Sequence, residues 1–166
     1  MLSVVPSVTA LGLAALAALL LAKRRSSPTR YLPERQAAAR ALGLAVAVQS
    51  VHFAEEAATG FHERLGGVFG LPGMDFSLFL AFNLMWLAIW VISIPGVRSA
   101  RTPALFAAWF LAIAGMLNGI AHPLLALVTG GYFPGLASSP LIAFASLWLW
   151  VKLRAATAPI SVSTVR

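Results

Sequence analysis

Three ionisable side chains lie within one turn of a segment that is otherwise apolar. His52 is followed three and four residues later by Glu55 and Glu56, and most of the flanking residues are hydrophobic. A charged side chain at the centre of a bilayer costs at least ~2.5 kcal/mol, so ionisable residues in such segments mark functional sites. In a helix these spacings place His52 on the same side as both carboxylates, which lie about 100° apart. We therefore expect these three side chains to face the interior of a helical bundle.

A second polar pair occurs in a later apolar segment. Asn118 and His122 are four residues apart, so they stack on one face of a helix, and Pro123 follows directly. Proline removes a backbone donor and frees carbonyl groups, which at membrane depth is tolerated only where protein or water can satisfy them. This pattern favours a polar cavity beside His122.

The expected depths of these groups in the membrane agree. At a rise of ~1.5 Å per residue, His52 lies about 18 Å, Asn118 about 22 Å and Asn83 about 17 Å from the cytoplasmic ends of their segments. Polar groups from three helices are thus expected to meet in the outer half of the membrane. Trp86 and Trp90 are expected to form walls of this pocket.

Two adjacent carboxylates in an apolar segment need a counter charge, because like charges repel and burial disfavours ionisation. A divalent cation would supply it, and nitrogen and oxygen ligands suit zinc or non-haem iron. The candidate ligands are His52, His122 and either Glu55 or Glu56. Asn118 is expected to be a weaker ligand or to orient water. Zinc would support hydrolysis and iron would support oxidation, and the spacing does not choose between them.

Two further functions are compatible with the same residues. Glu55 and Glu56 could form a metal-free acid and base pair, aided by a protonated histidine, which suits an isomerase or cyclase. The expected architecture is similar to that of the sterol isomerases of the EXPERA superfamily. Intramembrane His and Glu residues also occur in proton or cation transporters and in ligand sensors. The lack of an internal repeat disfavours transport by alternating access.

Three motifs resemble the signature motifs of the HXXEE family of integral membrane proteins. They are His52-x-x-Glu55-Glu56, Asn118-x-x-x-His122 and Tyr132-x-Pro134-Gly135. The resemblance spans most of the chain and implies that these residues form a conserved enzymatic site, without naming a reaction or substrate. Tyr132 is expected in a turn over the site, where it donates to a carboxylate or substrate, or anchors the chain at the membrane interface.

The composition is that of a polytopic membrane protein. The 166 residues are 60% hydrophobic and only 10% charged, and there is no cysteine, which excludes disulfides and thiolate metal sites. Segments of about 20 apolar residues match a ~30 Å hydrocarbon core. We expect a single all-α transmembrane domain of residues 1–166. Its five spans are predicted at about 4–22, 40–59, 76–94, 103–129 and 137–153.

The basic residues predict the orientation. Eleven of the twelve fall on one side of the predicted spans. They are Lys23, Arg24, Arg25, Arg30, Arg35, Arg40, Arg98, Arg101, Lys152, Arg154 and Arg166, and only Arg64 falls on the other side. By the positive-inside rule the N-terminus is outside and the C-terminus is cytoplasmic. The net charge of +7 thus reflects topology and gives no support to nucleic-acid binding. The first span is expected to be retained, because its basic residues follow the apolar run.

Smaller features complete the expectations. Asp75 is predicted to cap the third long helix, and Ser138 to cap the last one ahead of Pro140. The apolar stretch 66–73 is predicted to be a flexible loop, with a membrane-dipping lid as the alternative. His62 and Glu63 are expected to form a solvated pair.

Together the residues predict an enzyme of the bacterial cytoplasmic membrane that acts on a lipid-like substrate among membrane lipids. The oligomeric state is left open. The expected catalytic residues are His52, Glu55, Glu56, Asn118 and Tyr132.

Overall fold

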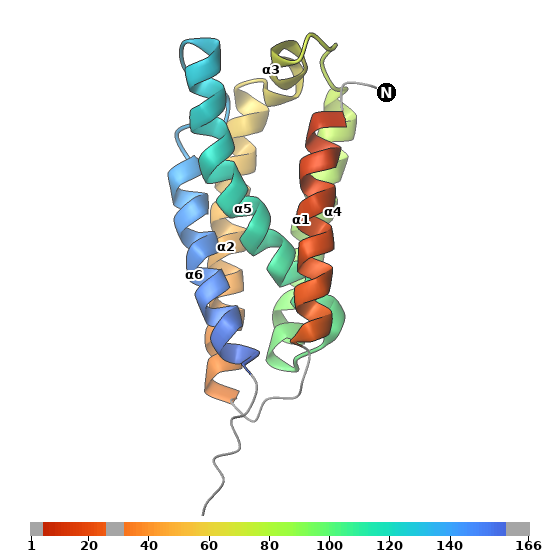
Figure 1. Cartoon of the computed structure of the whole chain (residues 1–166), viewed down its shortest axis with the longest axis vertical. Helices are drawn as coiled ribbons and strands as arrows, with labels where there is room; N and C mark the ends of the chain where they lie inside the picture. The colour runs from red at the N-terminus through yellow and green to blue at the C-terminus, as the bar shows by residue number, and fades with distance from the viewer. Residues whose placement is uncertain (1–4, 26–31, 159–166) are drawn as a thin grey trace, which may run out of the picture.

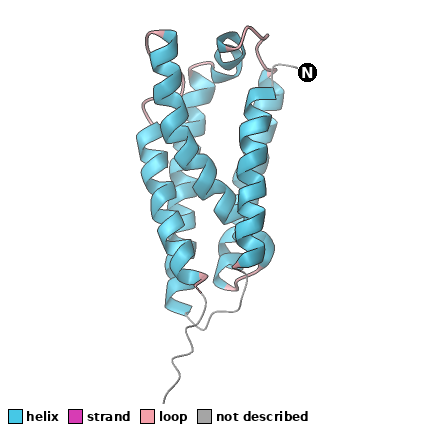
Figure 2. Ribbon diagram, viewed as in Figure 1, coloured by secondary structure: helices cyan, strands magenta, loops and turns pink. Residues whose placement is uncertain are grey.

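The computed structural model describes residues 5–25 and 32–158, and those residues form helices and connecting turns without a strand (Figure 2). The helices are α1 (Val5–Arg24), α2 (Leu32–Ala58), α3 (Phe61–Val68), α4 (Phe76–Arg98), α5 (Thr102–Thr129) and α6 (Ser139–Ala156). The predicted all-α class is confirmed. Three of these helices, α2, α4 and α5, are long and apolar enough to cross a membrane. The five-span topology and the orientation stay predictions.

The five long helices pack side by side, and α5 is the central one (Figure 1). It contacts α1, α4 and α6, while α2 packs between α4 and α6. The short α3 lies at the end of the bundle where α2 finishes (Figure 1). The end of α1, the start of α2, the α4–α5 turn and the end of α6 lie at the opposite end of the bundle (Figure 1). The basic residues predicted to share one side therefore lie toward one end, except Arg30 and Arg166, which are outside the described residues.

Small residues allow the helices to approach closely. Ala14, Ala18 and Ala22 form a buried stripe along α1, which packs on α5. On the other side of α5, a Cβ at Gly115 would overlap Ser146 of α6, and one at Gly119 would overlap Ala143. Helices in lipid gain little from apolar burial against one another, so close packing of small residues is their main source of cohesion.

Two helix boundaries differ from the predicted spans. The helix α2 begins at Leu32 rather than near residue 40, because polar residues such as Glu34 and Arg35 continue the helix beyond its apolar stretch. The helix α4 contains Pro95 and continues to Arg98, four residues beyond the end of the predicted span at 94. A proline removes one donor only, and the chain turns later, where the Arg101 N–H donates to the Gly96 carbonyl over 3.0 Å.

The stretch 66–73 is more ordered than a flexible loop. Residues 66–68 finish α3, which corrects that prediction for them. The rest folds back on α3, because the Leu71 N–H donates to the Gly66 carbonyl over 2.9 Å and the Met74 N–H to the His62 carbonyl over 2.7 Å. A Cβ at Gly66 would lie 2.8 Å from the Leu71 carbonyl oxygen, so this contact requires glycine. The predicted cap of the following helix is present, since the Asp75 carboxylate accepts from the Leu78 N–H over 3.0 Å.

Candidate metal centre

Two imidazoles and one carboxylate converge in the half of the bundle remote from the basic end. His52 and Glu56 come from successive turns of α2, and His122 comes from α5. Glu56 Oε1 lies 3.5 Å from His52 Nε2 and 3.3 Å from His122 Nε2. The three side chains are buried, and one potential ligand atom from each lies within 4.8 Å of the others. This three-ligand group, His52, Glu56 and His122, could hold one metal ion.

The hydrogen bond of His122 determines where its proton lies. His122 Nδ1 is 2.6 Å from the carbonyl oxygen of Pro134. A carbonyl oxygen can only accept, so Nδ1 carries the hydrogen and donates it. In the neutral ring Nε2 then presents a lone pair, and that atom faces Glu56.

The same argument applies to His52 through a serine. His52 Nδ1 is 2.8 Å from Ser138 Oγ. The single hydroxyl proton of Ser138 is donated to Glu55 in a short hydrogen bond, so Ser138 Oγ must accept from His52 Nδ1–H. His52 Nε2 is buried and has no hydrogen-bond partner among the described residues. Two imidazole lone pairs and a carboxylate oxygen therefore face one point, which requires a cation or an added proton there.

Glu55 has a different environment from Glu56. Its carboxylate accepts from the Tyr132 hydroxyl over 2.5 Å, the Ala137 N–H over 2.9 Å and the Ser138 N–H over 2.7 Å, besides the Ser138 hydroxyl. These four donors all belong to residues 132–138, which we call the cover segment. Of the two carboxylates proposed as ligands, the structure brings Glu56 to the histidines and engages Glu55 with the cover segment.

The cover segment lies directly over both imidazoles. A Cβ at Gly135 would collide with the His122 ring, lying 2.7 Å from its Nδ1, and would be 3.0 Å from His52 Cε1. Gly135 also has a φ of 86°, which L side chains rarely adopt. Arg64 fixes the same segment from α3, donating to the Tyr132 carbonyl over 3.0 Å with its guanidinium 5.5 Å from the Phe133 ring centre. The predicted position of this turn over the histidines is therefore present.

Aromatic rings surround the ligands. The ring of His122 lies 5.5 Å from that of Phe61 and 6.3 Å from that of Phe133. Phe79 connects this cluster to α4, with its ring 6.0 Å from Phe61 and 5.5 Å from Phe53. Such a shell excludes water and strengthens electrostatic interactions within the site.

Several residues predicted for the site make no hydrogen bond or ring contact with the three-ligand group among the described residues. The Asn118 side chain is half-buried and makes no hydrogen bond to any described residue. Asn83 donates to the Phe79 carbonyl of its own helix over 3.0 Å. Trp86 and Trp90 pack against Phe110 with ring centres 4.4 and 6.1 Å apart, and neither has a ring contact with a histidine among the described residues.

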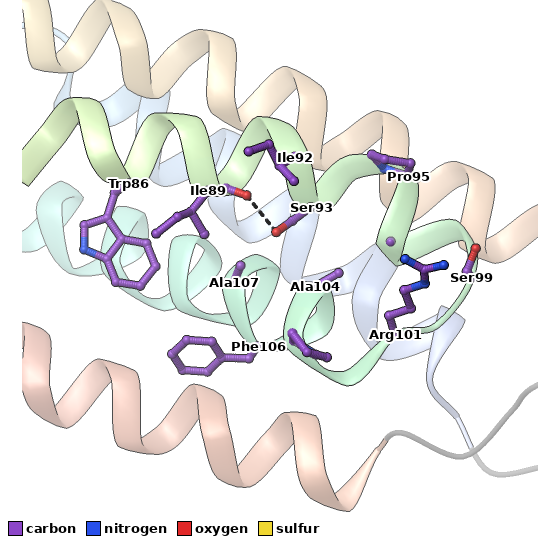
Figure 3. A pocket seen from close by; sticks show the side chains of 12 residues that line it. Trp86, Ile89, Ile92, Ser93, Pro95, Ser99, Arg101, Ala104, Phe106 and Ala107 are labelled. Carbon is purple, nitrogen blue, oxygen red and sulfur yellow. Dashed lines mark hydrogen bonds between the residues drawn. The ribbon is translucent and has the colours of Figure 1, made fainter.

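The tryptophans instead pack against α5. The Trp90 indole donates to the Ala107 carbonyl over 3.0 Å. Trp86 lines a separate groove near the α4–α5 turn (Figure 3). An estimate of depth gives the level of a side chain but not the direction in which it points. The walls beside the ligands are phenylalanines.

His62 is separate from the three-ligand group. Its Nε2 is 3.6 Å from Glu63 Oε1, as expected for a pair, and Glu63 is exposed. The His62 ring, however, packs 5.0 Å from that of Phe76 and 5.9 Å from that of Phe79, so this side is not solvated.

Ser138 is the residue that sequence reasoning missed. It was predicted as a helix cap, and it occupies that position in α6, but its side chain makes no capping hydrogen bond. It bridges His52 and Glu55 instead. Its local sequence is that of an ordinary helix start, so only the tertiary contact identifies its role.

Comparison with protein-family models, curated proteins and solved structures finds no match. The resemblance to the HXXEE family rests on the three motifs and stays a prediction.

Proposed function

We propose that the chain is a membrane-embedded metalloenzyme that binds one divalent ion through the three-ligand group and acts on a lipid-like substrate. The observation that supports this most is the orientation of the two imidazoles. Each ring donates its Nδ1 hydrogen to a fixed acceptor on the cover segment and turns Nε2 toward Glu56. Metal-binding histidines are commonly held in this way, with the second nitrogen bonded to a carbonyl or carboxylate.

The two known distances from the carboxylate to the imidazoles suit a tetrahedral ion, and the three ligand atoms lie within 4.8 Å of one another. Bonds of ~2.0–2.1 Å in a tetrahedron place neighbouring ligand atoms about 3.3–3.4 Å apart. The distances from Glu56 Oε1 to the two Nε2 atoms are 3.3 and 3.5 Å. Three protein ligands leave one position for water or substrate, as in catalytic zinc sites. Zinc bound there would supply hydrolytic chemistry and iron would supply oxidative chemistry.

The remaining polar residues support the ligands. Glu55 and Ser138 act as positioning residues, since they fix the tautomer and direction of His52. Tyr132 is 45% exposed while its hydroxyl contacts Glu55, so it is the polar group through which a substrate can first be recognised. The phenylalanine shell excludes bulk water from the ligands.

The surroundings of the site favour an apolar substrate. An open apolar groove of about 490 Å³ lies between the end of α5 and the cover segment, lined by Pro123, Ala126, Leu127, Gly130, Gly131 and Leu136. Its volume is within the ~300–1,000 Å³ typical of small-molecule sites. Leu136 belongs to the cover segment and Pro123 follows the ligand His122 in the chain, so the groove lies beside the segment that overlies the two imidazoles. An alkyl chain suits this lining.

The test is the metal content of detergent-purified protein prepared without chelators, measured by plasma mass spectrometry. We expect about one zinc or iron per chain in the wild type. His122→Ala and Glu56→Gln are expected to lose it. His62→Ala and Glu63→Gln are matched controls, because they remove the same groups outside the three-ligand group, and both are expected to retain the metal.

A metal-free acid and base pair is the second candidate. The 3.3 Å separation of His122 Nε2 and Glu56 Oε1 also suits a protonated imidazole facing a carboxylate. Absence of metal from freshly prepared wild-type protein, or equal metal content in all five proteins, would contradict the metalloenzyme. The pair would then be tested as an acid and base in isomerisation or cyclisation.

A further inference from the structure

A separate groove lies at the basic end of the bundle. It has a volume of about 580 Å³ and runs between α4 and α5 next to their connecting turn (Figure 3). Its walls are largely apolar, with Ile89 and Ile92 on α4 and Phe106 on α5. Figure 3 shows Trp86 at one end and Arg101 at the other. The groove is thus apolar along its length and cationic at one end.

This groove opens on a surface that faces outward. In α4, only 17% of the apolar stretch that could cross a membrane is buried within the chain. Ile92, which lines the groove, is 74% exposed. In a membrane-embedded bundle such a surface is in contact with lipid acyl chains.

The cationic end of the groove is held in place by the turn. The Arg101 N–H donates to the Gly96 carbonyl over 3.0 Å, and a Cβ at Gly96 would lie only 2.6 Å from that of Ala104. The two helices therefore meet closely beside Arg101. The Arg101 side chain is exposed and forms no ion pair with any described residue. Its charge is available to an external anion.

We propose that this groove binds an anionic phospholipid, with one acyl chain along α4 and the phosphate against Arg101. Twelve residues separate Trp86 from Arg98, the last residue of α4, so the lined stretch is about 18 Å long at a rise of ~1.5 Å per residue. Half of a ~30 Å hydrocarbon core is about 15 Å, the depth of one leaflet. An acyl chain whose phosphate lies at Arg101 therefore ends near Trp86. This site is independent of the proposed metal centre.

Quenching of tryptophan fluorescence by brominated acyl chains tests the proposal. The full chain is reconstituted in phosphatidylcholine vesicles containing increasing fractions of brominated phosphatidylglycerol or, in parallel, brominated phosphatidylcholine. Because the chain has five tryptophans, the Trp86 signal is obtained by subtracting the Trp86→Phe protein. We expect brominated phosphatidylglycerol to quench it at a mole fraction at least threefold lower than brominated phosphatidylcholine.

Two arginine variants distinguish lipid binding in the groove from general attraction of anionic lipids to the basic end of the bundle. Arg101→Gln is expected to raise the half-quenching fraction of phosphatidylglycerol at least threefold. Arg154→Gln removes an equal charge from the exposed end of α6 and is expected to leave the fraction unchanged. Equal quenching by the two lipids, or equal effects of the two arginine variants, would overturn the proposal. So would a Trp86 signal that neither lipid quenches, which would indicate that a second copy or another partner covers the groove.

Discussion

Replacing Gly135 by alanine tests whether the cover segment sets the positions of the two imidazoles. The new Cβ would collide with the His122 ring, 2.7 Å from Nδ1, and would lie 3.0 Å from His52 Cε1. Carbon and nitrogen atoms normally pack at about 3.5–4.0 Å, so both rings or the segment must shift by several tenths of an ångström. A metal site tolerates changes of only about 0.2 Å in its bond lengths. We therefore expect Gly135→Ala to lower metal affinity by ~10–100-fold, the usual effect of losing the groups that orient metal ligands.

Gly130→Ala is the matched control for this substitution. Gly130 has a φ of 73°, close to the 86° of Gly135, but nothing lies within 4 Å of its Cβ position. Both variants carry the backbone strain of a left-handed non-glycine residue, about 1–2 kcal/mol. Only Gly135→Ala adds the overlap with the histidines.

The assay is competition of the purified proteins with a fluorescent zinc chelator, alongside thermal unfolding in the same detergent. Similar losses of thermal stability are expected from the shared strain, with an additional loss for Gly135→Ala. Zinc affinity is expected to fall in Gly135→Ala alone. Equal zinc affinity in Gly135→Ala and Gly130→Ala would refute the conclusion that the cover segment determines the ligand geometry.

Three further predictions test other contacts. Ser138→Ala is expected to weaken metal binding ~10–100-fold, whereas Ser139→Ala, which loses only a bond to a backbone carbonyl, is expected to leave it unchanged in the same chelator competition. Burial and the hydrogen bond to the Glu55 carboxylate raise the pKa of Tyr132 in the folded protein. The hydrogen bond from Tyr132 to Glu55 therefore stabilises the fold below pH ~10, the pKa of an ordinary tyrosine, and this stabilisation is lost as the pH rises through the raised pKa of the folded state. In Tyr31→Phe protein, where Tyr132 is the sole tyrosine, phenolate absorbance should therefore titrate above pH ~10, and a midpoint at or below it would contradict this environment. Asp75→Ala removes the cap of α4 and is expected to cost about 0.5–2 kcal/mol in unfolding free energy without changing metal content, a result checked by thermal melts.

Much of the helical framework follows from the sequence, because long apolar stretches have few alternatives to helix. The cap at Asp75 was also predictable, since an acidic residue before an apolar run is a local signal. The start of α2 at Leu32 was not, because polar residues such as Glu34 extend a helix without adding to its apolar length. The continuation of α4 past Pro95 was missed because one lost donor does not end a helix that is otherwise hydrogen-bonded.

In the candidate site too, contacts within one helix were predictable and contacts between helices were not. The pairing of His52 with Glu56 follows from a spacing of four residues within one helix. The meeting of His122 with this pair depends on how α2 and α5 rotate about their axes, which no local pattern states. Trp86 shows the consequence, because its depth suited the pocket while its side chain turned toward Phe110. Ser138 is a second example. Its local sequence predicts a helix cap, whereas its hydroxyl contacts His52 of another helix.

The adjacency of Glu55 and Glu56 is itself an argument for two different roles. Neighbouring residues on a helix point about 100° apart, so two consecutive carboxylates cannot both approach one small group of ligands without distorting the helix. The structure gives each a distinct set of partners, with Glu56 between the two imidazoles and Glu55 on four donors of the cover segment. Ser138 connects these two sets of partners, because its hydroxyl accepts a hydrogen bond from His52 Nδ1 and donates one to Glu55. A pair of adjacent acids therefore suits a site in which one carboxylate, Glu56, binds the ion. The other, Glu55, then holds the cover segment, whose Ser138 orients the metal-binding residue His52.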